Sequence, residues 1–144
     1  MSDSLHIVCP HCDTVNRVPA PRLADRPTCG KCGRELFTGQ PLELNSANFL
    51  HHITRNDIPV LVDFWAPWCA PCRSMAPAYA QAAARLEPAL RLAKLDTEQA
   101  QELAARYAIR SIPTLALFRQ GREIARQAGA MNEAGIVGWA QAQR

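Results

Sequence analysis

The placement of its cysteines constrains this chain more than any other feature. All six of them fall into three Cys-x-x-Cys pairs, at residues 9–12, 29–32 and 69–72. Two cysteines at this spacing hold their sulfurs close enough to share a metal ion or to form a disulfide. The fold therefore has to place each pair in a tight turn or on the first turn of a helix.

The first two pairs have the C-x2-C-x16-C-x2-C pattern of a zinc ribbon. Four thiolates complete the tetrahedral coordination that Zn²⁺ prefers and leave no position open for a substrate. We therefore expect one structural zinc ion. His6 and His11 lie beside the first pair, but with four cysteines available we expect both to be exposed and not to bind the metal. The predicted ligands are Cys9, Cys12, Cys29 and Cys32.

Charge and hydropathy exclude other classes of protein. The net charge is only +3, and residues 1–44 carry five basic against five acidic side chains. A nucleic-acid binder concentrates basic residues on one face, so we expect no nucleic-acid partner. No run approaches the ~20 apolar residues of a membrane span, and residues 1–5 lack the pattern of a secretory leader. We expect a cytoplasmic protein, because the cytosol keeps thiols reduced and so suits both zinc thiolates and a catalytic dithiol.

Composition changes near residue 41. Residues 1–40 are rich in proline, glycine, cysteine and arginine, with short strands expected at 6–8 and 15–18. We predict a zinc-ribbon module over 1–40 and a second domain over 41–144.

The second domain alternates between strand and helix patterns. Its expected order is βαβαβαββα, an α/β domain in which helices cover both faces of a mixed sheet. Pro77 should kink the long helix that contains it. The expected strands are 41–44, 59–65, 90–95, 114–119 and 122–128; the expected helices begin at Asn45 or Ser46, at Pro71, at Asp96 or Thr97, and at Asn132, and the first three end at Arg55, Leu86 and Tyr107.

The third cysteine pair links the end of a buried strand to the start of a helix. The free N–H groups and partial positive charge of a helix N-terminus stabilise a thiolate. We therefore expect Cys69 to have a lowered pKa and to act as a nucleophile. Cys72 is close enough to attack a mixed disulfide on Cys69. The alternatives are a third metal half-site, for which no other cysteine is left, or two buried apolar cysteines.

Residues 42–144 resemble thioredoxin. The resemblance rests on segments 62–72, 93–96 and 109–114, together with Gly121 and Gly129, in the order of that family. The N-terminal zinc module makes the thioredoxin 2 group, the longer zinc-binding bacterial members, the nearest match. The resemblance implies a thioredoxin fold and protein-disulfide reductase activity. It also implies that an NADPH-dependent thioredoxin reductase regenerates the dithiol.

The resemblance also suggests a proton acceptor. Asp63 resembles the buried acid behind the second cysteine, and Lys94 the lysine beside that acid. A carboxylate within the apolar run Val60–Phe64 is costly to bury, so we expect a raised pKa. Asp63 would then take a proton from Cys72 through water. The alternative is an acid that faces solvent.

The expected substrate-binding residues are Trp68, Pro71, Ile112 and Pro113. By resemblance, Pro113 is a cis-proline whose bond leaves the Ile112 backbone free to pair with substrate, and Trp68 is exposed, whereas Trp65 is buried. Ala70 stands where the family usually has glycine. Since residues inside the pair tune the redox potential, that potential does not follow from the resemblance.

Other functions remain open from sequence. The chain could be a redox-controlled binding or holdase module, or a disulfide oxidase or isomerase, because the direction of exchange follows the potential. The zinc site could be structural or could respond to oxidation. We expect a monomer, whose partners are thioredoxin reductase and disulfide-containing proteins.

Overall fold

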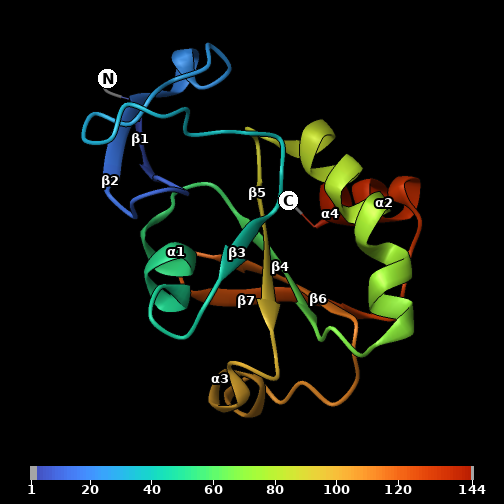
Figure 1. The fold of residues 1–144 in the computed structure, drawn as a ribbon. Helices are drawn as coiled ribbons and strands as arrows, with labels where there is room; N and C mark the ends of the chain where they lie inside the picture. Colours follow the sequence, from blue (N-terminus) through green and yellow to red (C-terminus); the bar gives the residue numbers. More distant parts are fainter. Residues whose placement is uncertain (1–2, 144) are drawn as a thin grey trace.

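A computed structural model describes residues 3–143. Strands β1 (Ser4–Val8) and β2 (Val15–Pro19) form a small antiparallel sheet, followed by a 3-10 helix, Ala20–Arg22. The segment after it carries the second cysteine pair and packs with the small sheet, and residues 42–143 form a larger α/β unit (Figure 1). Its elements are β3 (Leu42–Leu44), α1 (Phe49–Arg55), β4 (Val60–Trp65), α2 (Ala70–Leu86), β5 (Arg91–Asp96), α3 (Gln101–Arg106), β6 (Thr114–Arg119), β7 (Arg122–Ala128) and α4 (Glu133–Ala142).

The five-stranded sheet has the order β3-β5-β4-β6-β7. Strands β3, β5 and β4 are parallel, whereas β6 runs antiparallel to β4 and β7 antiparallel to β6. Helices α2 and α4 pack on one face around Leu61 and Leu117, and α1 and α3 pack on the other around Val62 and Phe118. The predicted element order and the two-sided helix cover are therefore confirmed. No helix among residues 3–143 is long and apolar enough to span a membrane.

Two predicted helix starts are wrong. Helix α1 begins at Phe49 because Asn45 accepts hydrogen bonds from the N–H groups of Ala47 (2.8 Å) and Asn48 (2.9 Å) and so closes a turn before the helix. In the same way Asp96 accepts from the Glu98 N–H (2.9 Å), and α3 begins only at Gln101. Short polar side chains stabilise such turns as readily as they cap helices.

The other helix starts agree with the sequence. Helix α2 begins at Ala70, one residue before the predicted start, with Pro71 in its first turn. Asn132 caps α4 by accepting the Gly135 N–H at 2.8 Å. Proline has no N–H to lose in a first turn, and asparagine is a favoured cap.

The small sheet docks onto the larger unit along the outer edge of β1. The Val8 N–H donates to Asn56 Oδ1 (2.8 Å), and the His6 N–H donates to Asp57 Oδ2 (2.6 Å). An apolar cluster joins the two parts at the same place. It contains Ile7, Cys9, Val18, Cys29, Leu36 and Ile58.

A buried arginine holds this contact together. Arg91, at the start of β5, is 1% exposed. Its Nη2 donates to the backbone oxygens of Leu36 (2.8 Å) and Val8 (3.2 Å), and its Nη1 lies 3.4 Å from the Glu87 carboxylate. Glu87 also accepts the Gly39 N–H at 3.1 Å. A buried charge needs hydrogen-bond partners. The backbone of the N-terminal module accepts two hydrogen bonds from this guanidinium, and Glu87 accepts another.

Replacement of Arg91 by methionine is expected to destabilise the protein by about 3–5 kcal/mol, because it leaves the Glu87 carboxylate buried without its partner. The matched control is Arg85→Met, which removes an exposed pair with Glu133 and should cost less than about 1 kcal/mol. Urea unfolding of both variants at neutral pH measures the difference. Equal losses for the two variants would contradict the assigned role of Arg91.

Candidate redox site and candidate metal centre

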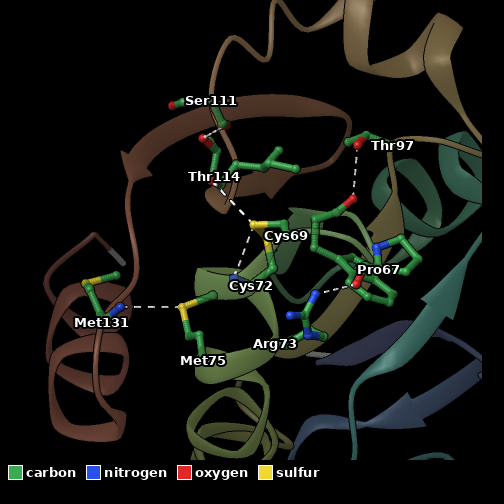
Figure 2. Close-up of a disulfide and its surroundings, with 11 residues drawn as sticks. Pro67, Cys69, Cys72, Arg73, Met75, Thr97, Ser111, Thr114 and Met131 are labelled. Atoms are coloured by element: carbon green, nitrogen blue, oxygen red, sulfur yellow. Dashed lines mark hydrogen bonds between the residues drawn. A yellow bond between two sulfur atoms is a disulfide. The ribbon is translucent and has the colours of Figure 1, made fainter.

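The third cysteine pair forms a disulfide where β4 passes into α2 (Figure 2). Cys69 is the N-cap of α2, Cys72 lies in its first turn, and their Cα atoms are 5.2 Å apart. The Cys72 N–H donates to Cys69 Sγ at 3.2 Å. That N–H also provides a hydrogen bond to a thiolate on Cys69 once the disulfide is reduced, which favours the charged form.

Two side chains that the sequence analysis missed hold the loop before the disulfide. Arg73 donates from Nη1 to the Pro67 oxygen (2.8 Å), and Thr97 donates from its hydroxyl to the Trp65 oxygen (3.0 Å). Both contacts are visible in Figure 2. A single arginine and a single threonine carry no motif, so only the folded chain identifies them.

The loop that contains the predicted cis-proline lies against the disulfide. The Ile112–Pro113 bond is cis, as predicted, and Pro113 is buried. The Ile112 carbonyl oxygen lies 3.8 Å from Cys69 Sγ. The Thr114 hydroxyl donates to the Ser111 oxygen (2.6 Å) and so holds this loop, as Figure 2 shows.

The two tryptophans differ in exposure. Trp68 is 64% exposed beside the disulfide, as predicted. Trp65 was expected to be buried, but it is partly exposed and packs against the cluster of Ala66, Cys69 and Cys72. It is the last residue of β4 and the only one in that strand that is not buried.

Asp63 is completely buried in the middle of β4. Neither of its carboxylate oxygens has a hydrogen-bond partner within residues 3–143. Burial raises the pKa of Asp63 to about 7. The positive charge of Lys94 lowers this pKa and the negative charge of Glu43 raises it, both by less than burial does. The expected direction of the shift and the burial of Asp63 are both confirmed, and the alternative of a solvent-facing acid is wrong.

Lys94 lies directly across from Asp63 in the pairing of β5 with β4. Its Nζ is 4.3 Å from the centroid of the Trp65 ring. Glu43 on β3 pairs with Lys94 in turn. The three charged residues thus form one row across the sheet, and the exposed Glu43 is its outer member.

Asp63→Asn is expected to stabilise the protein at alkaline pH. The folded pKa of about 7 exceeds the ordinary value of 3.8, so the folded chain binds more protons between these values and its stability falls as pH rises through about 7. Above that pH the burial of the charge costs about 4 kcal/mol. The variant should therefore gain about 3–4 kcal/mol at pH 8 and almost nothing at pH 4.

Urea unfolding at a series of pH values measures this gain. Glu98→Gln, which removes an exposed carboxylate on the turn before α3, should leave the pH dependence unchanged. A gain for Asp63→Asn that is equal at pH 4 and pH 8 would contradict the raised pKa.

The other four cysteines gather into one cluster, with all Sγ atoms within 4.8 Å of one another. Cys9 Sγ lies 3.7 Å from Cys32 Sγ, and Cys12 Sγ lies 3.6 Å from Cys29 Sγ. Four sulfurs bound to one Zn²⁺ at about 2.3 Å would be about 3.8 Å apart. The cluster therefore has the size of a tetrahedral zinc site. His11 is exposed and points to the Glu35 oxygen (3.2 Å), not to the cluster.

The two cysteine pairs have the same local structure. In each, the N–H two residues after the first cysteine, on His11 or Lys31, donates to that cysteine's Sγ (3.3 and 3.4 Å). Hydrogen bonds to its sulfur lower the pKa of Cys29 to about 6. The largest effect comes from the Cys32 backbone and the next from the Asn16 side chain. Burial raises the pKa of Cys9 to about 12. Metal binding at this cluster would therefore displace a proton from Cys9 at neutral pH.

Asp13 connects the cluster to the larger unit. It follows Cys12 with a positive φ of 65°, a conformation that aspartate tolerates better than most residues. Its carboxylate lies 2.7 Å from Nε2 of the buried His52, and its carbonyl oxygen lies 2.7 Å from Nε2 of His51. The equivalent position of the second pair is Gly33, also at positive φ. The sequence analysis did not single out Asp13, because an aspartate at a position suited to glycine does not by itself identify its histidine partners.

Comparison with known proteins agrees with both sites. The family model "Thioredoxin" matches residues 40–142, and the family model "Thioredoxin 2, N-terminal" matches residues 8–34. Thioredoxin C-3 of Corynebacterium nephridii is 44% identical over 137 residues, 95% of this chain and 94% of that protein. Thioredoxin of Porphyra purpurea is 42% identical over 89 residues, 62% of this chain and 83% of that protein.

The matched regions contain the disulfide at the start of α2 and the four-cysteine cluster. The chain belongs to the thioredoxin family of dithiol–disulfide oxidoreductases, with a cysteine cluster of the zinc-ribbon type at its N-terminus.

Proposed function

We propose that the protein reduces disulfides in other proteins, with Cys69 as the nucleophile. The Cys69 thiolate attacks one sulfur of the substrate disulfide, forms a mixed disulfide and releases the other substrate sulfur as a thiolate. The Cys72 thiolate then attacks Cys69 Sγ, releases the second substrate thiol and closes the Cys69–Cys72 disulfide. Two electrons pass from the dithiol to the substrate. The position of Cys69 as the N-cap of α2 carries this assignment.

Asp63 is the proposed acceptor of the Cys72 proton. Its buried carboxylate has a pKa near neutral pH, the range in which a general base is most effective. Lys94 opposite it is the proposed counter-charge. Because neither oxygen of Asp63 has a partner within the described chain, a water molecule would carry the proton from Cys72.

The surface around Cys69 is the proposed substrate site. Trp68 and Pro71 are exposed on either side of Cys69, and the backbone of Ile112, held by Pro113, faces its sulfur. An extended substrate segment would pair with that backbone. The side chain of Ala70 is only a methyl group, so we expect it to leave room for the substrate to approach Cys69.

The metal proposed for the cluster is one Zn²⁺ held by Cys9, Cys12, Cys29 and Cys32. Bound zinc would cross-link a module whose apolar cluster is too small to fold alone. The module docks at the start of β4, and the disulfide follows its end, about 20 Å along the strand. A structural role for the zinc fits this separation better than a part in the disulfide chemistry.

We further propose four properties of the protein. These are a boundary between residues 1–40 and 41–144, a monomeric state, a cytoplasmic location, and regeneration by thioredoxin reductase with NADPH. Equal elution volumes by gel filtration across a range of protein concentrations would support the monomer.

The test of the proposed function is insulin-disulfide reduction coupled to NADPH and thioredoxin reductase, together with the reduction potential measured against glutathione. A potential near −270 mV with steady turnover supports a reductase. A potential above about −180 mV with no turnover favours the oxidase or isomerase alternative. Protection of an unfolded client without turnover favours a holdase.

A further inference from the structure

The small N-terminal sheet has two edges, and residues 3–143 cover only one of them. Cys9 N donates to Thr14 O (2.8 Å), and Ala20 N donates to Asp3 O (2.7 Å). Bonded and non-bonded pairs alternate in an antiparallel ladder. The bonded pairs between these two ends are therefore Ile7–Asn16 and Leu5–Val18, in the observed register.

The remaining residues of each strand point their backbone groups outward. On β1 these are His6 and Val8, and their N–H groups donate to Asp57 and Asn56. On β2 they are Val15, Arg17 and Pro19, opposite Val8, His6 and Ser4. No backbone partner for Arg17 exists on that side within residues 3–143. Such an unpaired edge is a template for another strand.

A groove runs along this open edge. Residues 16–19 of β2 form one wall, and the segment from Arg22 to Thr28 supplies the other. The groove has a volume of about 270 Å³. A strand laid beside β2 would therefore lie between two walls and not on a flat surface.

The groove carries a small excess of positive charge. Arg17 and Arg22 are exposed, and neither forms an ion pair or a side-chain hydrogen bond within the described chain. Asp25 is the one acidic side chain in its lining. Unpaired guanidinium groups bind carboxylates through paired hydrogen bonds.

We propose that this groove binds an extended, acidic segment of a partner protein, which adds to β2 as a third strand. The backbone of the segment pairs with the N–H and carbonyl groups of Arg17 and with the carbonyl group of Pro19, and its acidic side chains contact Arg17 and Arg22. Binding by strand addition takes affinity from main-chain hydrogen bonds and specificity from side chains. The groove lies on the ribbon and contains none of the residues proposed for disulfide exchange, so this binding does not depend on the proposed function.

The charge requirement is tested with a fluorescein-labelled peptide of alternating glutamate and valine, by fluorescence anisotropy on the zinc-loaded full chain. The expected result is saturable binding that weakens at least about tenfold in the double variant Arg17→Glu, Arg22→Glu. The matched control is Arg55→Glu, an exposed arginine on α1, which should bind as the unaltered protein does. A twin peptide with lysine in place of glutamate should not bind.

The strand-addition requirement is tested with two N-methylated peptides. One is methylated at the odd amides and the other at the even amides, so only one of them loses the N–H groups that face β2. The expected result is loss of binding for one peptide and retention for the other. Insulin reduction and zinc content, measured on every variant, show whether the fold is intact.

Three outcomes would overturn the proposal. The first is no saturable binding of the glutamate peptide at millimolar concentration. The second is undiminished binding to the double variant. The third is equal binding of both N-methylated peptides, which would indicate attraction of charge without strand pairing.

Discussion

Cys69→Ser is expected to lose insulin reduction by at least about 1000-fold, because a serine hydroxyl is not ionised at neutral pH and cannot replace a thiolate. Cys72→Ser is expected to fail differently. Its Cys69 still attacks, but nothing resolves the product, so the variant should remain linked to its substrate through Cys69. The measurement is NADPH oxidation in the coupled assay, with mass spectrometry of the mixed disulfide.

Each variant is the matched control of the other, because each removes one sulfur atom at the start of α2. Both should keep the four cysteines of the metal cluster and their zinc content. Trapping of substrate by Cys69→Ser, or equal residual turnover in the two variants, would contradict the assignment of Cys69 as the nucleophile. Loss of zinc from either variant would indicate damage to the fold.

Removal of the metal is the change with the second-largest expected effect. Cys29→Ser, or chelation of the unaltered protein, should lower the unfolding temperature by about 10 °C or more, because the small N-terminal cluster cannot fold without its cross-link. Backbone amides between residues 4 and 36 should lose hydrogen-exchange protection. Those of β4 and β6, in the centre of the larger sheet, should keep most of it.

His11→Ala is the matched control, because His11 lies inside the first cysteine pair but points away from the cluster. It should keep zinc and the unfolding temperature of the unaltered protein. Insulin reduction by the metal-free protein should stay within about twofold, since the N-terminal module docks at the start of β4 and the disulfide lies beyond the other end of that strand. A larger loss while the larger domain stays folded would show that zinc regulates the activity.

Several features of this protein follow from its sequence alone because they depend on neighbours in the chain. The spacing of the first two cysteine pairs predicts the four-cysteine cluster, and the place of the third pair between a buried strand and a helix predicts the disulfide. The buried strand β4 follows from its continuous apolar run, and the burial of Asp63 follows from that strand. The cis bond before Pro113 followed from the family resemblance, since the residues around it do not predict one.

Other features were decided only by the tertiary structure. Asn45 and Asp96 can each cap a helix or close a turn by their residue type, and in the folded chain both close a turn. Arg91 reads in sequence as an ordinary residue at a strand end, as His52 does on a helix. Their partners in the N-terminal module lie 39 to 83 residues away along the chain. No local pattern in the sequence encodes such a contact. A charged or polar group needs a partner only when it is buried, and these groups become buried only when the two modules pack together.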